Sequence, residues 1–143
     1  MRTNDIINYA RSFKKIWRTN NPYEIAERFG IDVVFRENAF QDFTAQTIKV
    51  EGYPTIISIN TKFSERGKRV LCAHELGHAL LHEDAINDFA TNSRNISTNV
   101  EYEANLFAIA LLTDSDFDKQ LVTPLNRMNN YLLKTIIESN LND

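Results

Sequence analysis

The sequence predicts an α+β fold, in which a short, mostly antiparallel sheet packs on a central helix and further helices lie at both ends of the chain. Three observations lead to this prediction. Apolar residues recur at helical spacing near both ends of the chain. Two β-rich runs, 43–50 and 55–59, surround a short turn, which favours an antiparallel pair. The segment Glu65–His82 is apolar around most of its circumference, as a buried helix is.

The elements before the paired strands follow from periodicity and capping residues. Residues 5–18 place their apolar side chains at the spacing of an amphipathic helix. Asn21-Pro22 is typical of a helix cap followed by proline at the first helical position, and Gly30 is typical of the residue just past a helix end. Because residues 31–35 are rich in β-branched and aromatic side chains, we expect a first strand there.

The remaining elements lie beside and after the central helix. The turn between the paired strands is Glu51-Gly52-Tyr53-Pro54. Residues 84–99 are polar and predict a loop with a short helical piece near 85–89. A strong helix is expected over 100–112, and a last helix begins at Thr123-Pro124.

Length, charge and cysteine content limit the class of protein. A chain of 143 residues can bury one hydrophobic core, so we expect a single domain over residues 1–143. Its net charge of −3 and pI near 5.6 disfavour nucleic acid as a direct partner. Charges interrupt residues 1–20, unlike a secretory signal, and no apolar run approaches the roughly 20 residues that span a bilayer. With Cys72 as its single cysteine, the chain is expected to be cytoplasmic and to have no membrane partner.

The pentapeptide His74-Glu75-Leu76-Gly77-His78 matches the zinc-peptidase pattern H-E-x-x-H. Residues four apart share one face of a helix, so His74 and His78 can both point at one metal ion. Glu75 is offset by about 100° from His74, so it can approach the metal without ligating it. The pattern therefore predicts a Zn²⁺ cofactor that activates a water molecule, with Glu75 as the catalytic base.

A catalytic zinc usually takes three protein ligands, so a third is expected elsewhere in the chain. His82 lies about 12 Å along the helix from His74, too far for one ion, and is interpreted as a residue behind a ligand, on the surface or at the helix end. The best candidate is Glu101, with Asn105 four residues later to accept a hydrogen bond from a ligating histidine. The less favoured candidates are Glu103, Asp84, Asp88 and Asp114.

Two further parts of the predicted site have more than one interpretation. The donor that stabilises the developing oxyanion is Tyr53, Tyr102 or the metal alone. Zinc is the metal that a mixed histidine and carboxylate set favours, although Mn²⁺ and Fe²⁺ accept the same ligand types. We also expect the strand 55–59 to be an exposed edge on which an extended peptide substrate can pair.

Two segments together resemble the ImmA/IrrE family of metallopeptidases: Arg69–His82 and Glu101–Leu112. The helix, glycine and strand within 22–35 also fit the upstream layout of that family. The resemblance covers about residues 20–113, which leaves residues 114–143 as a C-terminal helical extension. One departure is Thr113-Asp114, which stands where the family commonly has Met-Pro.

The resemblance implies a zincin-like fold, with His74, His78 and Glu101 as zinc ligands and Glu75 as the catalytic base. It also implies an endopeptidase whose protein substrate is a helix-turn-helix repressor, so that cleavage derepresses a prophage or mobile element. The alternative is a zinc-containing binding module that sequesters a repressor without cutting it, or that regulates a stress response. Because all of the expected catalytic groups are present, the enzyme is the favoured hypothesis.

Overall fold

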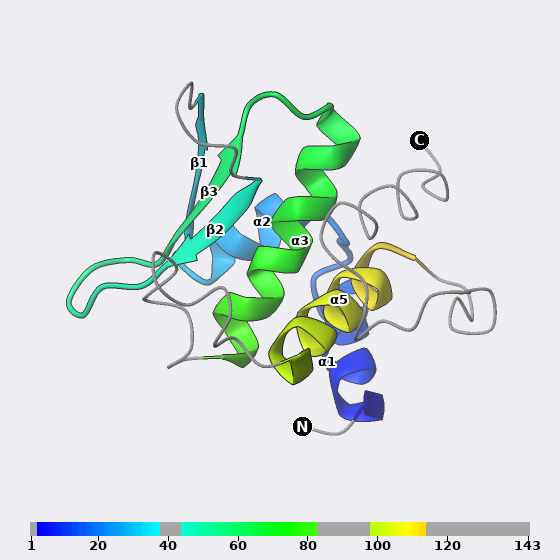
Figure 1. Ribbon diagram of the computed structural model, residues 1–143. Coiled ribbons are helices and arrows are strands. Elements are labelled where there is room, and N and C mark those ends of the chain that lie inside the picture. The colour runs from blue at the N-terminus through cyan, green and yellow to red at the C-terminus, as the bar shows by residue number, and fades with distance from the viewer. Residues whose placement is uncertain (1–2, 38–43, 83–97, 114–143) are drawn as a thin grey trace.

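The computed structural model describes residues 3–37, 44–82 and 98–113, which form an α+β fold (Figure 1). The fold class predicted from the sequence is confirmed, and every described element lies within a few residues of its expected position. The helical piece expected at 85–89, the helix expected from Thr123 and the whole of 114–143 lie outside the described residues. In chain order the elements are helix α1 (Thr3–Ile16), helix α2 (Pro22–Arg28), strand β1 (Asp32–Arg36), strand β2 (Ala45–Ile48), strand β3 (Ile56–Asn60), helix α3 (Glu65–Leu81) and helix α5 (Thr98–Leu112).

The three strands form a mixed sheet in the order β1-β3-β2. The antiparallel pair expected from the turn is present, with Thr47 of β2 opposite Ile57 of β3. However, β1 pairs with β3 in parallel, so the expectation of a mostly antiparallel sheet is wrong in this detail. The expectation that 55–59 forms an exposed edge is also wrong, because β3 is the central strand. The physical reason for the central place of β3 is burial. Ile57 and Ser58 point to opposite faces of the sheet and both are buried, as in a strand whose two faces are covered.

Helix α3 lies between the sheet and α5, and α1 packs against α5 (Figure 1). Helix α2 covers parts of β1 and α3. Every residue of α3 from Val70 to Ala79 is buried, which agrees with its apolar sequence. The central position of α3 brings its middle residues into contact with the sheet on one side and with α5 on the other.

Helices α3 and α5 approach each other closely at Gly77. A Cβ atom at this position would lie 3.2 Å from Cα of Ala104 and 3.2 Å from Cβ of Phe107. Glycine therefore lets the backbone of α5 lie directly against α3, next to the histidines of the zinc-peptidase pattern. The neighbouring Phe107 and Leu76 are wholly buried in the core.

Capping side chains set where α2 and α3 begin. Oδ1 of Asn21 accepts a hydrogen bond from the backbone N–H of Tyr23, and Oγ of Ser64 accepts one from that of Gly67, each at 3.0 Å. Helix α2 ends before Gly30, whose φ of 71° is one that glycine adopts at little cost. These caps fix the ends of the two helices that pack on the sheet.

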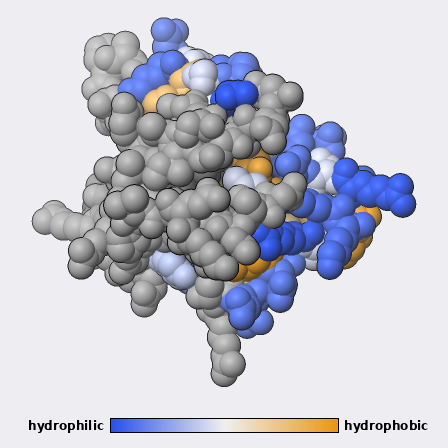
Figure 2. Space-filling view, turned by 90° about the vertical axis from the view of Figure 1, so that its right-hand side faces the viewer, coloured by the Kyte–Doolittle hydropathy of each residue, from blue (hydrophilic) through white to orange (hydrophobic). Residues whose placement is uncertain are grey.

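On the face shown in Figure 2, the described residues are mostly hydrophilic and the hydrophobic ones form small separate groups. Within the described ranges, no helix combines the length and hydropathy that crossing a bilayer requires. Among the residues that the structure describes, the exposed large hydrophobic side chains are Ile16, Phe29, Phe35, Val50 and Tyr53.

Candidate metal centre

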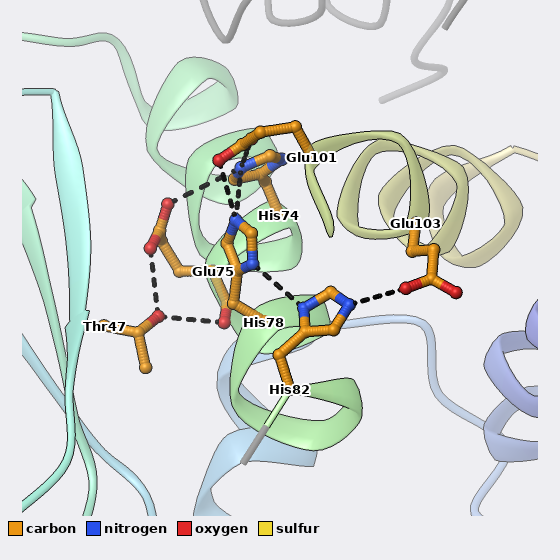
Figure 3. Close-up of polar contacts among 7 residues, drawn as sticks. All are labelled: Thr47, His74, Glu75, His78, His82, Glu101 and Glu103. Carbon is orange, nitrogen blue, oxygen red and sulfur yellow. Dashed lines mark hydrogen bonds and ion pairs between the residues drawn. The ribbon is translucent and has the colours of Figure 1, made fainter. Parts of the chain in front are cut away.

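Three side chains from α3 and α5 converge between the two helices (Figure 3). His74 and His78 lie one turn apart on α3, and their Nε2 atoms are 3.2 Å apart. Glu101, in the first turn of α5, places Oε2 3.1 Å from Nε2 of His74 and Oε1 3.3 Å from Nε2 of His78. Both histidines are buried and Glu101 is partly exposed. The structure thus brings together the three residues expected to be metal ligands.

The spacing of these donor atoms suits a divalent metal ion. Ligand atoms that bind a tetrahedral zinc at about 2.0–2.1 Å lie about 3.3–3.4 Å from one another. The three distances in this cluster are 3.1, 3.2 and 3.3 Å. Two imidazole nitrogens and a carboxylate are also a ligand set of catalytic zinc sites. The residues present therefore fit a bound metal ion.

Electrostatics favour a cation in this cluster. Burial alone would raise the pKa of Glu101, but hydrogen bonds to His74 and His78 and the charges of these residues hold it well below its usual range. For His74, burial alone would lower the pKa, yet contacts with Glu101, Glu75 and Asn105 raise it overall. Two carboxylates thus act on the Nε2 atom that faces the cluster, and a positive charge is stabilised there.

Glu75 lies beside the three donors and is not one of them. Its Oε2 atom is 3.8 Å from Nε2 of His74, and its side chain is almost wholly buried. Its Oε1 atom accepts a hydrogen bond of 2.9 Å from the Thr47 hydroxyl (Figure 3). This is the position that the helical offset from His74 predicts for a residue that approaches the metal without ligating it.

Thr47 is a candidate functional residue that the sequence did not reveal. Besides Oε1 of Glu75, its hydroxyl lies 3.0 Å from the backbone oxygen of Glu75. Two residues further along the chain, the ammonium of Lys49 donates a hydrogen bond of 2.9 Å to the backbone oxygen of Ala79. A threonine in a strand is ordinary, so only the period-two alternation of Thr47 and Lys49 could have indicated a shared face toward α3.

The remaining polar residues near the cluster lie behind the histidines. Asn105 is wholly buried and close enough to His74 to contribute to its raised pKa. His82 ends α3, and its Nδ1 lies 3.1 Å from Nδ1 of His78. Its Nε2 lies 2.9 Å from Oε1 of Glu103. His82 therefore lies both at the end of α3 and behind His78, and Glu103 contacts His82 instead of the donor cluster.

Three aspartates and two tyrosines are the remaining candidates for a metal ligand or an oxyanion donor. Asp84, Asp88 and Asp114 lie outside the described residues. Tyr53 is 74% exposed in the turn between β2 and β3, and Tyr102 is half-buried on α5 and packs against the core. The oxyanion donor stays a prediction.

Comparison with known proteins agrees with this geometry. Residues 26–133 match the peptidase family described as IrrE N-terminal-like domain. Over 99 residues the chain is 34% identical to Uncharacterized immunity region protein 2 of Bacillus phage phi105, a match that covers 68% of this chain. The chain spans 61% of the length of that relative. No solved structure matches the chain. The family match covers most of the chain and both of its paired motifs, so the chain belongs to the ImmA/IrrE family of metallopeptidases.

Proposed function

We propose that this protein is a zinc-dependent endopeptidase that cleaves a helix-turn-helix transcriptional repressor and thereby derepresses a prophage or mobile element. The observation that carries the proposal is the convergence of His74, His78 and Glu101, with the Glu75 carboxylate beside them. The name of the phage phi105 relative, an immunity region protein, supports a substrate among the proteins that maintain phage immunity. Because a repressor of this kind acts on DNA inside the cell, we propose a cytoplasmic site of action.

Each residue of the cluster has one part in this proposal. His74, His78 and Glu101 would hold the metal ion, and Asn105 lies close enough to His74 to accept a hydrogen bond from the ring nitrogen that faces away from the metal. A bound Zn²⁺ supplies Lewis acidity for a carbonyl oxygen and for an attacking water. Glu75 accepts the proton of that water and later passes it to the leaving amine.

Strand β2 is the edge on which we propose that the substrate pairs. Within the described part of the chain, β2 hydrogen-bonds to β3 on one side only. It also carries Thr47, whose hydroxyl contacts Glu75. An extended peptide that pairs with the other edge of β2 would run past the catalytic base. Strand β3 has no such edge, because it already pairs with β1 and β2.

The test is to compare the wild type with Glu75→Gln, using a helix-turn-helix repressor as substrate. A matched control is Glu65→Gln, which changes an exposed carboxylate on the same helix that pairs with Lys68. We expect zinc to be retained in all three proteins, as measured by mass spectrometry of the metal. Cleavage should fall about 10²–10⁴-fold in Glu75→Gln, because a general base typically contributes that much, and should be unchanged in Glu65→Gln.

Other results would favour different functions. Cleavage by Glu75→Gln at the wild-type rate would exclude Glu75 as the base. If the wild type and Glu75→Gln both released repression without any cleavage, the result would instead indicate that the protein sequesters its repressor.

A further inference from the structure

Both ring nitrogens of His78 take part in polar contacts that lead to helix α5 (Figure 3). Nε2 faces Oε1 of Glu101 at 3.3 Å. Nδ1 lies 3.1 Å from Nδ1 of His82, and Nε2 of His82 lies 2.9 Å from Oε1 of Glu103. Both glutamates belong to α5 and both histidines lie at the C-terminal end of α3. His78 is therefore connected to α5 directly through Glu101 and indirectly through His82 and Glu103.

We propose that Glu103 and His82 are a positioning pair that fixes the ring orientation and the tautomer of His78 and thereby strengthens metal binding. The inference rests on the metal site of the proposed function and assigns a role to two residues outside the donor cluster. Metal-binding histidines commonly donate their second N–H to a carboxylate or a carbonyl. In this protein an imidazole lies between the ligand and the carboxylate.

The number of hydrogens on the two rings allows one arrangement. A neutral imidazole carries a single N–H, and the nitrogen that binds a metal must present its lone pair. Since Nε2 of His78 faces the cluster, its hydrogen is on Nδ1 and is donated to Nδ1 of His82. The hydrogen of His82 is then on Nε2. A carboxylate only accepts, so this N–H is donated to Glu103.

Glu103 thus determines the direction of both hydrogen bonds. Without its carboxylate, His82 could place its hydrogen on Nδ1, and two N–H groups would face each other across 3.1 Å. The ring of His78 would have to turn, which would move Nε2 away from His74 and Glu101. The side chains of His82 and Glu103 are 7% and 23% exposed, so water screens this contact less than it screens a surface pair.

The simpler interpretation is that the pair only ties α3 to α5. The two interpretations differ in what Glu103→Ala does to the full-length protein. A tie between helices would affect the free energy of unfolding alone. A positioning pair also affects the zinc dissociation constant and the tautomer of His82, and both should recover in Glu103→Gln, which keeps a carbonyl oxygen that can accept.

The experiment measures the zinc dissociation constant by competition with a chromophoric chelator, in the wild type, Glu103→Ala, Glu103→Gln and the control Glu65→Ala. We expect about 10–100-fold weaker zinc binding in Glu103→Ala, the range typical of residues that orient a metal ligand. Glu103→Gln should recover most of this loss. Glu65→Ala should bind zinc like the wild type, because its exposed carboxylate pairs with Lys68.

Long-range ¹H–¹⁵N NMR spectra of the same zinc-loaded proteins provide the second readout. The chain contains three histidines, and all three lie in this group, so each ring can be assigned. We expect His82 as the Nε2–H tautomer in the wild type and as a mixture of tautomers in Glu103→Ala. Unchanged zinc affinity and unchanged tautomers in Glu103→Ala would overturn this inference alone. Failure of the wild type to bind zinc would overturn the metal site on which both proposals rest.

Discussion

The Thr47 hydroxyl donates a hydrogen bond to Oε1 of Glu75 across 2.9 Å, from the edge strand of the sheet to the helix that carries both histidines. Both side chains are buried, so this contact is protected from water. The other oxygen of the same carboxylate, Oε2, is 3.8 Å from Nε2 of His74. The sheet thus restrains the carboxylate that the proposed reaction uses as its base.

Thr47→Val is expected to slow catalysis while metal binding is unaffected. Valine keeps the shape of threonine but removes the hydroxyl, and a hydrogen bond to a charged group contributes about 1.5–3 kcal/mol. We therefore expect kcat to fall at least about tenfold, with little change in KM or in zinc content. The measurement is the rate of repressor cleavage at several substrate concentrations.

The control for this variant is Thr47→Ser, which retains the hydroxyl and should retain most of the activity. A normal kcat in Thr47→Val would show that Glu75 is oriented without Thr47. An equal loss of kcat in the serine variant would point to packing of the threonine methyl group instead.

Metal removal is expected to expose Cys72 to thiol reagents. Cys72 is wholly buried in α3, and its burial raises the pKa of its thiol, with the charge of Glu75 adding to the effect. Since the thiolate is the reactive species, labelling requires that α3 opens. A ligand that binds only the folded state stabilises it by about 2.7 kcal/mol at 100 times its dissociation constant.

With zinc at that concentration, we expect labelling about 100-fold slower than in chelator-treated protein. Cys72 is the single cysteine of the chain, so the total rate of thiol labelling reports the reactivity of Cys72 alone. Equal labelling rates with zinc and with chelator would contradict a metal site on α3. Addition of Mg²⁺ in place of zinc is the control and should leave the fast rate unchanged, because histidine nitrogens are poor ligands for it.

Local signals in the sequence predicted the helices, the strands and the shared face of the two histidines, because these depend on neighbours in the chain. Helical spacing placed His74 and His78 on one face, and the same spacing joined Glu101 to Asn105. Strand order depends instead on partners far apart in sequence, and the insertion of β3 between β1 and β2 leaves one hint, the run 56–59, in which three isoleucines surround a single polar residue, Ser58.

The polar contacts around the cluster depend on how the helices and strands pack. No spacing of residues along the sequence predicts them. Thr47 reaches Glu75 because β2 lies against α3. Glu103 is rotated by about 200° from Glu101 on an ideal helix, which argued against a ligand role. That rotation gives no indication that Glu103 meets His82, since this contact depends on where the end of α3 lies beside α5.

Asn105→Leu is expected to weaken zinc binding through His74. Asn105 is wholly buried beside His74, and leucine has a similar volume but no oxygen to accept the ring N–H. We expect the zinc dissociation constant to rise about 10–100-fold, as for other residues that orient a metal ligand. Asn105→Asp restores an acceptor and should bind zinc more tightly than the leucine variant. Chelator competition measures both, and wild-type affinity in Asn105→Leu would show that His74 is oriented by its surroundings without this amide.

Gly77→Ala tests whether the close approach of α3 and α5 is needed to form the metal site. Alanine favours a helix by about 1 kcal/mol over glycine, which alone would stabilise the protein. The added Cβ would lie 3.2 Å from Cα of Ala104 and from Cβ of Phe107, and overpacking of a core typically costs about 1–3 kcal/mol. Because a backbone atom of a buried helix cannot easily move aside, we expect a net loss of about 1 kcal/mol or more in urea denaturation.

The same substitution should weaken zinc binding, because it displaces the helix that carries Glu101. Gly30→Ala is a control that should lose a comparable amount of stability. Nothing lies within 4 Å of the added Cβ, but the φ of 71° at this position strains an alanine by about 1 kcal/mol. Gly30 follows α2 and belongs to neither of the helices that carry the donors, so this variant should lose stability and keep its zinc affinity. Similar zinc affinities in the two variants would mean that the separation of α3 and α5 does not control the site. A loss confined to Gly77→Ala would show that the missing side chain between the histidines of the motif sets the distance at which Glu101 meets them.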